Sequence, residues 1–163
     1  MFLPVVLFST VICLVTSVCE YKRSNKGLTR LPADIPHDVT FIKLRQNNLT
    51  KINYIPVFPK LNNIRLDHNK LREFPNVDNV ANTLLSIGVG YNQIKEIPSR
   101  RILSLVHLVK LNVQGNPLVS LPNFGLLPRL PGLVVHLDQT ENFYCDWRMA
   151  AVKEAETVGE DNV

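Results

Sequence analysis

Apolar and polar positions alternate in a repeating pattern through the middle of the chain. One template, apolar-x-x-apolar-x-apolar-x-x-Asn-x-apolar, fits four segments, which begin at Val39, Leu61, Leu84 and Leu108. The asparagines of these segments are spaced 22, 23 and 24 residues apart. They are Asn47, Asn69, Asn92 and Asn116. This regular recurrence indicates an internal repeat.

The template predicts the local structure of each repeat. Its centre alternates with a period of two, which is typical of a short β-strand with one buried face. The asparagine then turns the chain, and a buried side-chain amide can bond backbone groups in its own turn and in the next repeat. The regular spacing therefore favours a ladder of buried asparagines over exposed turn residues. Residues 97–108 have apolar side chains at near-helical spacing, which predicts a short helix or 3₁₀ turn.

The four segments resemble leucine-rich repeats, whose consensus L-x-x-L-x-L-x-x-N-x-L and period of about 20–29 residues they match. The resemblance covers about residues 27–145. It implies an α/β solenoid: a leucine-rich repeat horseshoe with a parallel concave β-sheet and mixed 3₁₀, helical and extended segments on the convex side. We assign four repeats to residues 39–132 and a degraded repeat to 133–142, with Val135 and Leu137 as candidate inward residues.

The ends of the repeat array resemble the caps of this family. Residues 18–38 resemble an N-terminal cap, although Arg23 stands where a cysteine is usual, which leaves Cys19 without an obvious partner. Residues 143–163 resemble a truncated cysteine-type C-terminal cap, in which Cys145 fits the opening motif. About five strand spacings of ~4.8 Å separate Cys19 from Cys145, too far for a disulfide within one chain. Cys145 is then free, bonded to another chain, or part of a shortened version of a longer protein.

The first seventeen residues carry no charged side chain and end in small residues. They predict a secretory signal peptide, cut after Ser17 or after Cys19, with an uncleaved membrane anchor as the alternative. No later segment approaches the roughly 20 apolar residues that a membrane span requires. We therefore expect a secreted protein in an oxidising, extracellular setting, without a stable membrane span after cleavage.

Composition and charge narrow the function. The chain is 45% hydrophobic and 20% charged, which is typical of a globular protein. A net charge of +4 favours acidic partners but is too sparse for a dedicated nucleic-acid binder. The sequence contains no nucleophile elbow or Walker motif, and its four histidines fall in different repeats without metal-ligand spacing. We expect a non-catalytic protein that uses no metal or cofactor.

The positions between the apolar template residues predict one exposed surface, the concave face. Four cations and one acid fall on it, so it is net basic. The candidate partner-binding residues are Phe41, Lys43, Arg45, Arg65, Asp67, His68, Gly88, Gly90, Tyr91, Lys110, Asn112 and Gln114. They predict recognition of an extracellular protein or an anionic glycan, in adhesion, signalling or innate immunity. The alternatives are a structural matrix component of the small leucine-rich proteoglycan type, and a sheet face that is merely solvated.

Two features of the repeats call for a separate explanation. Gly88 and Gly90 lie within a predicted strand, where glycine is costly, so they either form a phosphate-binding turn or clear space. Gln93 replaces the third glycine of a phosphate loop, so we expect an exposed shallow notch beside Tyr91. Asn48 begins the sequence's one N-x-[ST] motif and is a candidate glycosylation site.

Overall fold

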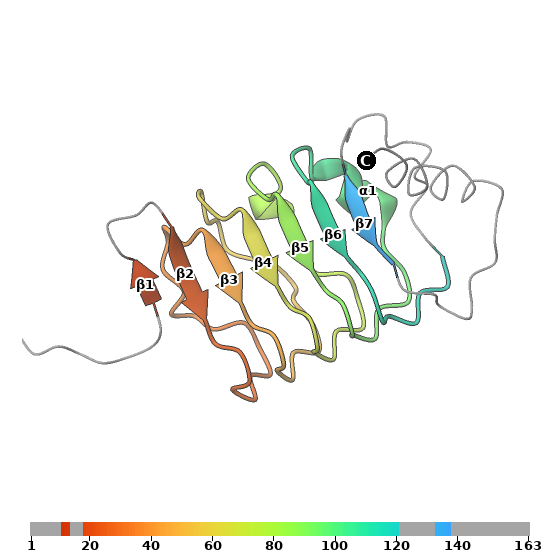
Figure 1. Cartoon of the computed structure of the whole chain (residues 1–163), viewed down its shortest axis with the longest axis horizontal. Helices are drawn as coiled ribbons and strands as arrows, with labels where there is room; N and C mark the ends of the chain where they lie inside the picture. Colours follow the sequence, from red (N-terminus) through yellow and green to blue (C-terminus); the bar gives the residue numbers. More distant parts are fainter. Residues whose placement is uncertain (1–10, 14–17, 121–132, 138–163) are drawn as a thin grey trace, which may run out of the picture.

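The computed structural model describes residues 11–13, 18–120 and 133–137. Within these ranges, seven short strands form one sheet in chain order (Figure 1). The first two strands are antiparallel, and every later pair is parallel. The strands are β1 (Val11–Cys13), β2 (Cys19–Lys22), β3 (Phe41–Lys43), β4 (Asn63–Arg65), β5 (Ser86–Gly88), β6 (Lys110–Asn112) and β7 (Val134–His136). This arrangement confirms the predicted leucine-rich repeat solenoid.

The core is built from the middle residue of each parallel strand. These residues stand opposite one another across the sheet and form a single inward column. The column contains Tyr21, Ile42, Ile64, Ile87, Leu111 and Val135. The first five are at most 1% exposed, and Val135 and Leu137 are partly buried against the same core. Because each parallel strand adds only one side chain to this inward column, each repeat depends on its neighbours for stability.

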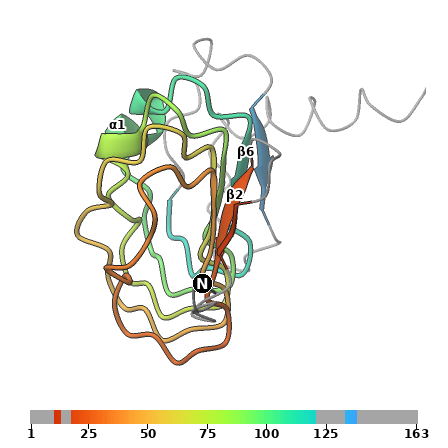
Figure 2. The ribbon, with the colours of Figure 1, turned by 90° about the vertical axis from the view of Figure 1, so that its left-hand side faces the viewer.

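The segments that return from one strand to the next cover the inner side of the sheet (Figure 2). Most of them are irregular. The segment before β5 contains a 3₁₀ turn, Asp78–Val80, and the segment before β6 contains helix α1, Ser99–Ser104. Helix α1 lies on the side of the solenoid opposite the sheet and buries Ile102 (Figure 2). The near-helical spacing of residues 97–108 therefore predicted a real helix.

The buried asparagines join the repeats at the turn after each strand. Asn92 Oδ1 accepts a hydrogen bond from Leu71 N–H at 3.0 Å. Its Nδ2 donates to the carbonyls of Val89 at 2.9 Å and Leu66 at 3.1 Å. Asn47, Asn69 and Asn116 make the same kinds of bond, and all four asparagines are at most 8% exposed.

Strand β2 shows that the N-terminal cap is part of the sheet, which the sequence analysis missed. Tyr21 pairs with Ile42, and Arg23 N–H donates to the Lys43 carbonyl at 2.9 Å. The sequence offers no obvious partner for Cys19, but in the structure Cys19 is disulfide-bonded. The hairpin of β1 and β2 places Cys13 opposite it in the backbone register. Cys145 and the predicted C-terminal cap lie outside the described residues.

Polar contacts brace the cap beside the first repeat. Tyr21 Oη donates to Asp34 Oδ1 at 2.6 Å, and Arg23 Nη2 donates to Asp34 Oδ2 at 2.7 Å. The hydrogen bond from Tyr21, assisted by the Arg23 charge, lowers the pKa of Asp34. Burial raises the pKa of the Tyr21 phenol, and the Asp34 carboxylate raises it further. The cap therefore closes the core with an aromatic side chain whose polar end is satisfied.

Candidate functional site: the concave face

The outer face of the sheet carries eight of the twelve predicted binding residues in two rows. The strand register aligns the first row across the sheet, and backbone hydrogen bonds between the turns that follow align the second. The first row consists of Lys43, Arg65, Gly88 and Asn112. The second consists of Arg45, Asp67, Gly90 and Gln114. Residues from four different repeats thus lie side by side on one rigid surface.

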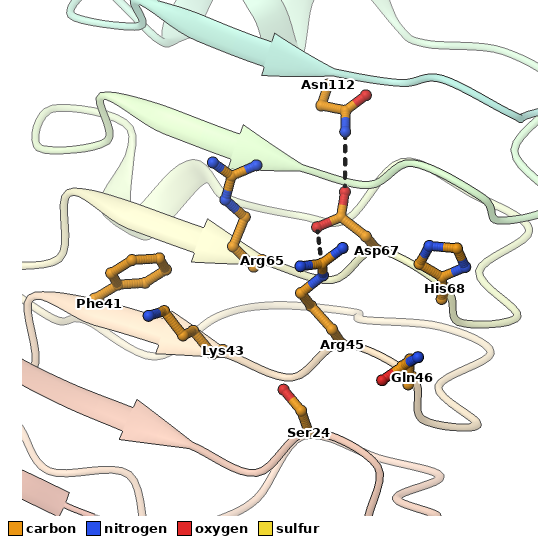
Figure 3. A pocket seen from close by; sticks show the side chains of 9 residues that line it. All are labelled: Ser24, Phe41, Lys43, Arg45, Gln46, Arg65, Asp67, His68 and Asn112. Carbon is orange, nitrogen blue, oxygen red and sulfur yellow. Dashed lines mark hydrogen bonds and ion pairs between the residues drawn. The ribbon is translucent and has the colours of Figure 1, made fainter. Parts of the chain in front are cut away.

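A hollow of about 600 Å³ lies on this face, and we call it the concave hollow (Figure 3). Seven of its nine lining residues are predicted binding residues: Phe41, Lys43, Arg45, Arg65, Asp67, His68 and Asn112. The other two are Ser24 and Gln46. Ser24 was missed because it follows β2, a strand that the repeat template does not detect. The remaining predicted residues, which do not line the hollow, are Gly88, Gly90, Tyr91, Lys110 and Gln114.

Asp67 corrects the expectation of an exposed acid on this face. It is only 3% exposed, and its carboxylate contacts the neighbouring repeats. Its Oδ1 accepts hydrogen bonds from Gly90 N–H at 3.1 Å and from Asn112 Nδ2 at 3.2 Å. Arg45 Nε lies 3.5 Å from Oδ2 (Figure 3). Asp67 thus joins three consecutive repeats and the Arg45 of a fourth, as a structural support rather than an open contact.

The expectation that Gly88 and Gly90 leave an exposed notch is also wrong, because both glycines are buried. A Cβ at Gly88 would lie 2.9 Å from both carboxylate oxygens of Asp67 and 3.0 Å from Arg65 Cδ. A Cβ at Gly90 would lie 3.2 Å from Asp67 Oδ1 and 3.1 Å from Asn112 Nδ2. The glycines do clear space, but side chains of adjacent repeats fill that space.

Aromatic rings stack at the end of the face where the strands turn. The rings of His68 and Tyr91 lie 4.4 Å apart and are nearly parallel, at 6°. Both residues have left-handed backbone conformations, with φ of 56° and 52°. The Tyr91 ring also covers Gly115, where a Cβ would lie 2.5 Å from its Cδ1. The left-handed turns and this glycine hold an aromatic platform beside the concave hollow, with Tyr91 44% exposed.

The charges of the face are partly compensated. Glu20 on β2, absent from the predicted site, lies 3.4 Å from Lys43 Nζ and also pairs with Lys22. The hydrogen bond with Lys22 lowers the pKa of Glu20, and the charge of Lys43 lowers it further. Lys43 Nζ also lies 4.3 Å from the centre of the Phe41 ring, a cation–π geometry. This surface therefore presents a few oriented charges rather than a broad basic field.

Within residues 18–120 and 133–137, no three histidine, cysteine or acidic side chains are grouped as metal ligands would be. None of the helices in these ranges has the length and apolar character that crossing a bilayer requires. The chemistry offered by the described face is thus that of charged, amide and aromatic side chains.

Comparisons with known proteins agree with the repeat fold. No family model matches the chain. Over 94 residues, it is 31% identical to osteomodulin of Bos taurus, which covers 56% of this chain and 22% of the relative. Over 76 residues, it is 34% identical to lumican of Gallus gallus, and the match covers 44% of this chain and 22% of that relative. Over 125 residues, it is 31% identical to the platelet glycoprotein Ib alpha chain of Mus musculus, and the match covers 62% of this chain and 17% of that relative.

The matched relatives include leucine-rich repeat proteins, in agreement with the repeat pattern of this chain. The chain spans about a fifth of the length of these relatives. Among solved structures, it aligns with a leucine-rich repeat protein of Leptospira interrogans at a TM-score of 0.48 and 22% identity, over 63% of this chain and 28% of that one.

Proposed function

We propose that this chain is a secreted, non-catalytic module that recognises a protein partner through its concave face. The concave hollow carries the proposal, because it brings three cations and an aromatic ring from neighbouring repeats into one depression. Backbone hydrogen bonds and the Asp67 contacts hold these residues in place, which lowers the entropy lost on binding. Arginine and aromatic side chains are also the residue types that most often dominate binding energy at interfaces.

The relatives support an extracellular setting. Osteomodulin and lumican are extracellular matrix proteins with leucine-rich repeats, and platelet glycoprotein Ib is found at the cell surface. We extend that setting to this chain, with residues 1–17 as its signal peptide, so that cleavage would remove β1 and Cys13, and with Asn48 as a glycosylation site. Asn48 is half-buried at the turn of its repeat, and Thr50 of the same motif is exposed. An intermolecular disulfide through Cys145 belongs to the same proposal.

A second function is favoured by the matches to osteomodulin and lumican. In it, the chain is a structural matrix component of the small leucine-rich proteoglycan type, and the basic face binds an anionic glycan. The two functions differ in their dependence on salt. Binding to a polyanion weakens steeply as salt rises, whereas a protein contact built on aromatic anchors weakens little.

The experiment is a binding screen of the secreted full chain against extracellular proteins and sulfated glycans, followed by salt titration of each hit. We compare wild type with the Lys43→Glu/Arg65→Glu variant, which reverses two charges of the concave hollow. The matched control is Lys60→Glu/Arg72→Glu, which makes the same charge change at two exposed positions outside the hollow. Loss of binding only in the first variant, with an unchanged circular dichroism spectrum, supports the concave face. Equal binding by both variants rejects it.

A further inference from the structure

The cations of the concave hollow differ in whether a carboxylate already compensates them. Lys43 Nζ lies 3.4 Å from Glu20 Oε1, and Arg45 Nε lies 3.5 Å from Asp67 Oδ2. Among the described residues, no carboxylate pairs with the guanidinium of Arg65. Arg65 is therefore the cation in the hollow whose charge is available to a ligand.

The neighbouring strand fixes where this free guanidinium lies. Gly88 stands opposite Arg65 in the register and has no side chain to block it. Arg65 Cδ lies 3.0 Å from the site of a Gly88 Cβ, so the arginine extends across β5 (Figure 3). Asp67 lies close by but is already bonded to Gly90 N–H, Asn112 and Arg45. Arg65 is thus a half-buried residue beside an acid that is bonded to other partners, and its fork is directed over the face.

The charge pattern distinguishes between two kinds of anionic ligand. A sulfated glycan carries negative charge along its whole length and needs several uncompensated cations. The hollow offers one such cation, and the carboxylates of Glu20 and Asp67 lie at its margin and within it. A ligand with a single carboxylate matches one uncompensated arginine, because the planar guanidinium fork binds a carboxylate through two parallel hydrogen bonds.

The surroundings of Arg65 fit a protein segment rather than a free ion. Phe41 lines the same hollow, and the stacked rings of His68 and Tyr91 lie at its turn side. These rings provide apolar surface for side chains on either side of an acidic residue. Resting on the proposed function, we propose that Arg65 anchors one aspartate or glutamate of a protein partner, with aromatic contacts to the residues that flank it.

The test is a selection of random linear peptides on the immobilised full chain, with the Arg65→Met variant selected in parallel. We expect wild-type selection to enrich peptides with one acidic residue next to aromatic or aliphatic ones, and Arg65→Met selection not to. For an enriched peptide, we measure affinity for both proteins and repeat the measurement with its acidic residue changed to the amide. Each change should weaken binding about tenfold or more, and the two together should cost little more than either alone.

Two controls separate this inference from the loss of fold or charge. Arg72→Met makes the same substitution at an exposed position outside the hollow and should leave affinity unchanged. Arg65→Lys keeps the charge but lacks the fork, so it should recover only part of the affinity. Additive losses, or full recovery by lysine, overturn the bidentate contact. Salt-sensitive binding of a heparin oligosaccharide that Arg65→Met abolishes, without enrichment of acidic peptides, overturns the choice of a protein carboxylate.

Failure of this inference can be told apart from failure of the proposed function. Phe41→Ala truncates an aromatic side chain of the hollow without touching Arg65, and Tyr54→Ala is its control, at a position 64% exposed between β3 and β4. If Phe41→Ala weakens binding and Arg65→Met does not, the concave face binds a partner without a carboxylate anchor. If neither variant weakens binding of any selected peptide, both proposals are rejected.

Discussion

The asparagine ladder makes a quantitative prediction at Asn92. Replacing Asn92 with alanine removes one acceptor, Oδ1, and one donor group, Nδ2, from a site that is 7% exposed. The three carbonyls that Nδ2 bonds each keep another donor: Leu66 keeps Asn69 Nδ2 at 2.8 Å, Val89 keeps Asn116 Nδ2 at 2.9 Å, and Gly90 keeps His68 N–H at 2.9 Å. The N–H of Leu71 loses its partner at 3.0 Å. The main consequence of Asn92→Ala is therefore one orphaned, buried backbone donor.

That loss sets the expected magnitude. An unsatisfied buried donor costs about 1–3 kcal/mol, whereas the three carbonyls, each with a remaining donor, add little. We therefore expect Asn92→Ala to lower the free energy of unfolding by about 1–3 kcal/mol. For a chain of this size, each kcal/mol corresponds to a fall of about 2–4 °C in melting temperature. Because a repeat array couples neighbours, the loss should spread to the adjacent strands β4 and β5.

The assay is urea unfolding followed by circular dichroism, combined with hydrogen exchange at the turns. Asn82→Ala is the matched control, because Asn82 is exposed and makes no side-chain hydrogen bond among the described residues, so it should change stability by less than about 0.5 kcal/mol. An unchanged midpoint for Asn92→Ala, together with unchanged exchange of the Leu71 amide, would refute the ladder as a source of stability.

An isosteric substitution tests the same reasoning through pH. In Asn92→Asp, the carboxylate can still accept from Leu71 N–H, but it faces the carbonyls of Val89 and Leu66 without a proton to donate. Burial raises the pKa of such an aspartate in the folded state above its unfolded value of about 3.9. The variant therefore loses stability as pH rises above about 4, and should be closer to wild type at acidic pH. If Asn92→Asp lowers the free energy of unfolding equally at acidic and at neutral pH, this account is contradicted.

Three further changes test the cap and the glycines. Gly88→Ala should lower the free energy of unfolding by about 1–2 kcal/mol in urea, because its Cβ would meet the Asp67 carboxylate at 2.9 Å; an unchanged midpoint would show that the carboxylate shifts freely. Gly115→Ala combines a φ of +65° with a 2.5 Å approach to the Tyr91 ring, so it should cost about 1–3 kcal/mol and change the near-ultraviolet spectrum of the ring stack. The folded-state pKa of Asp34 is lowered, so its ionised carboxylate stabilises the fold above about pH 4. This stabilisation is lost as the pH falls through the lowered folded-state pKa. At pH 7, the Asp34→Asn variant should therefore have a free energy of unfolding about 0.5–1 kcal/mol lower than that of wild type, a small effect because the group is exposed. Near pH 2, the two proteins should be equally stable.

Some features could be predicted because one local rule determines them. The inward residues of β3–β6 follow from their spacing, since a strand alternates its faces and only apolar side chains fit the core. Helix α1 follows from near-helical spacing and a proline before its first residue. In each case, a short stretch of sequence contains all the physical information that the element needs.

Strand β2 was missed because the cap has the backbone geometry of a repeat, but its residues do not match the repeat template. Tyr21 fills the core position 21 residues before Ile42, and Lys26 stands where a ladder asparagine would be. The Lys26 N–H still donates to Asn47 Oδ1, at 2.9 Å, so the ladder reaches the cap from one side only. A search for any large apolar residue one period before the first template would have found Tyr21.

The two strand glycines mark the limit of reading a face from alternation alone. Alternation correctly places Gly88 and Gly90 on the outer face, but it cannot tell whether a side chain from the next repeat lies over them. Asp67 and Arg65 lie over Gly88, and Asp67 and Asn112 lie over Gly90, so the burial of the glycines depends on three repeats at once. Asp67, the one acid that the sequence places on this face, is thereby buried and paired, and Gly88 leaves room for the Arg65 side chain. The space they clear is thus filled by neighbouring side chains and is not exposed on the concave face.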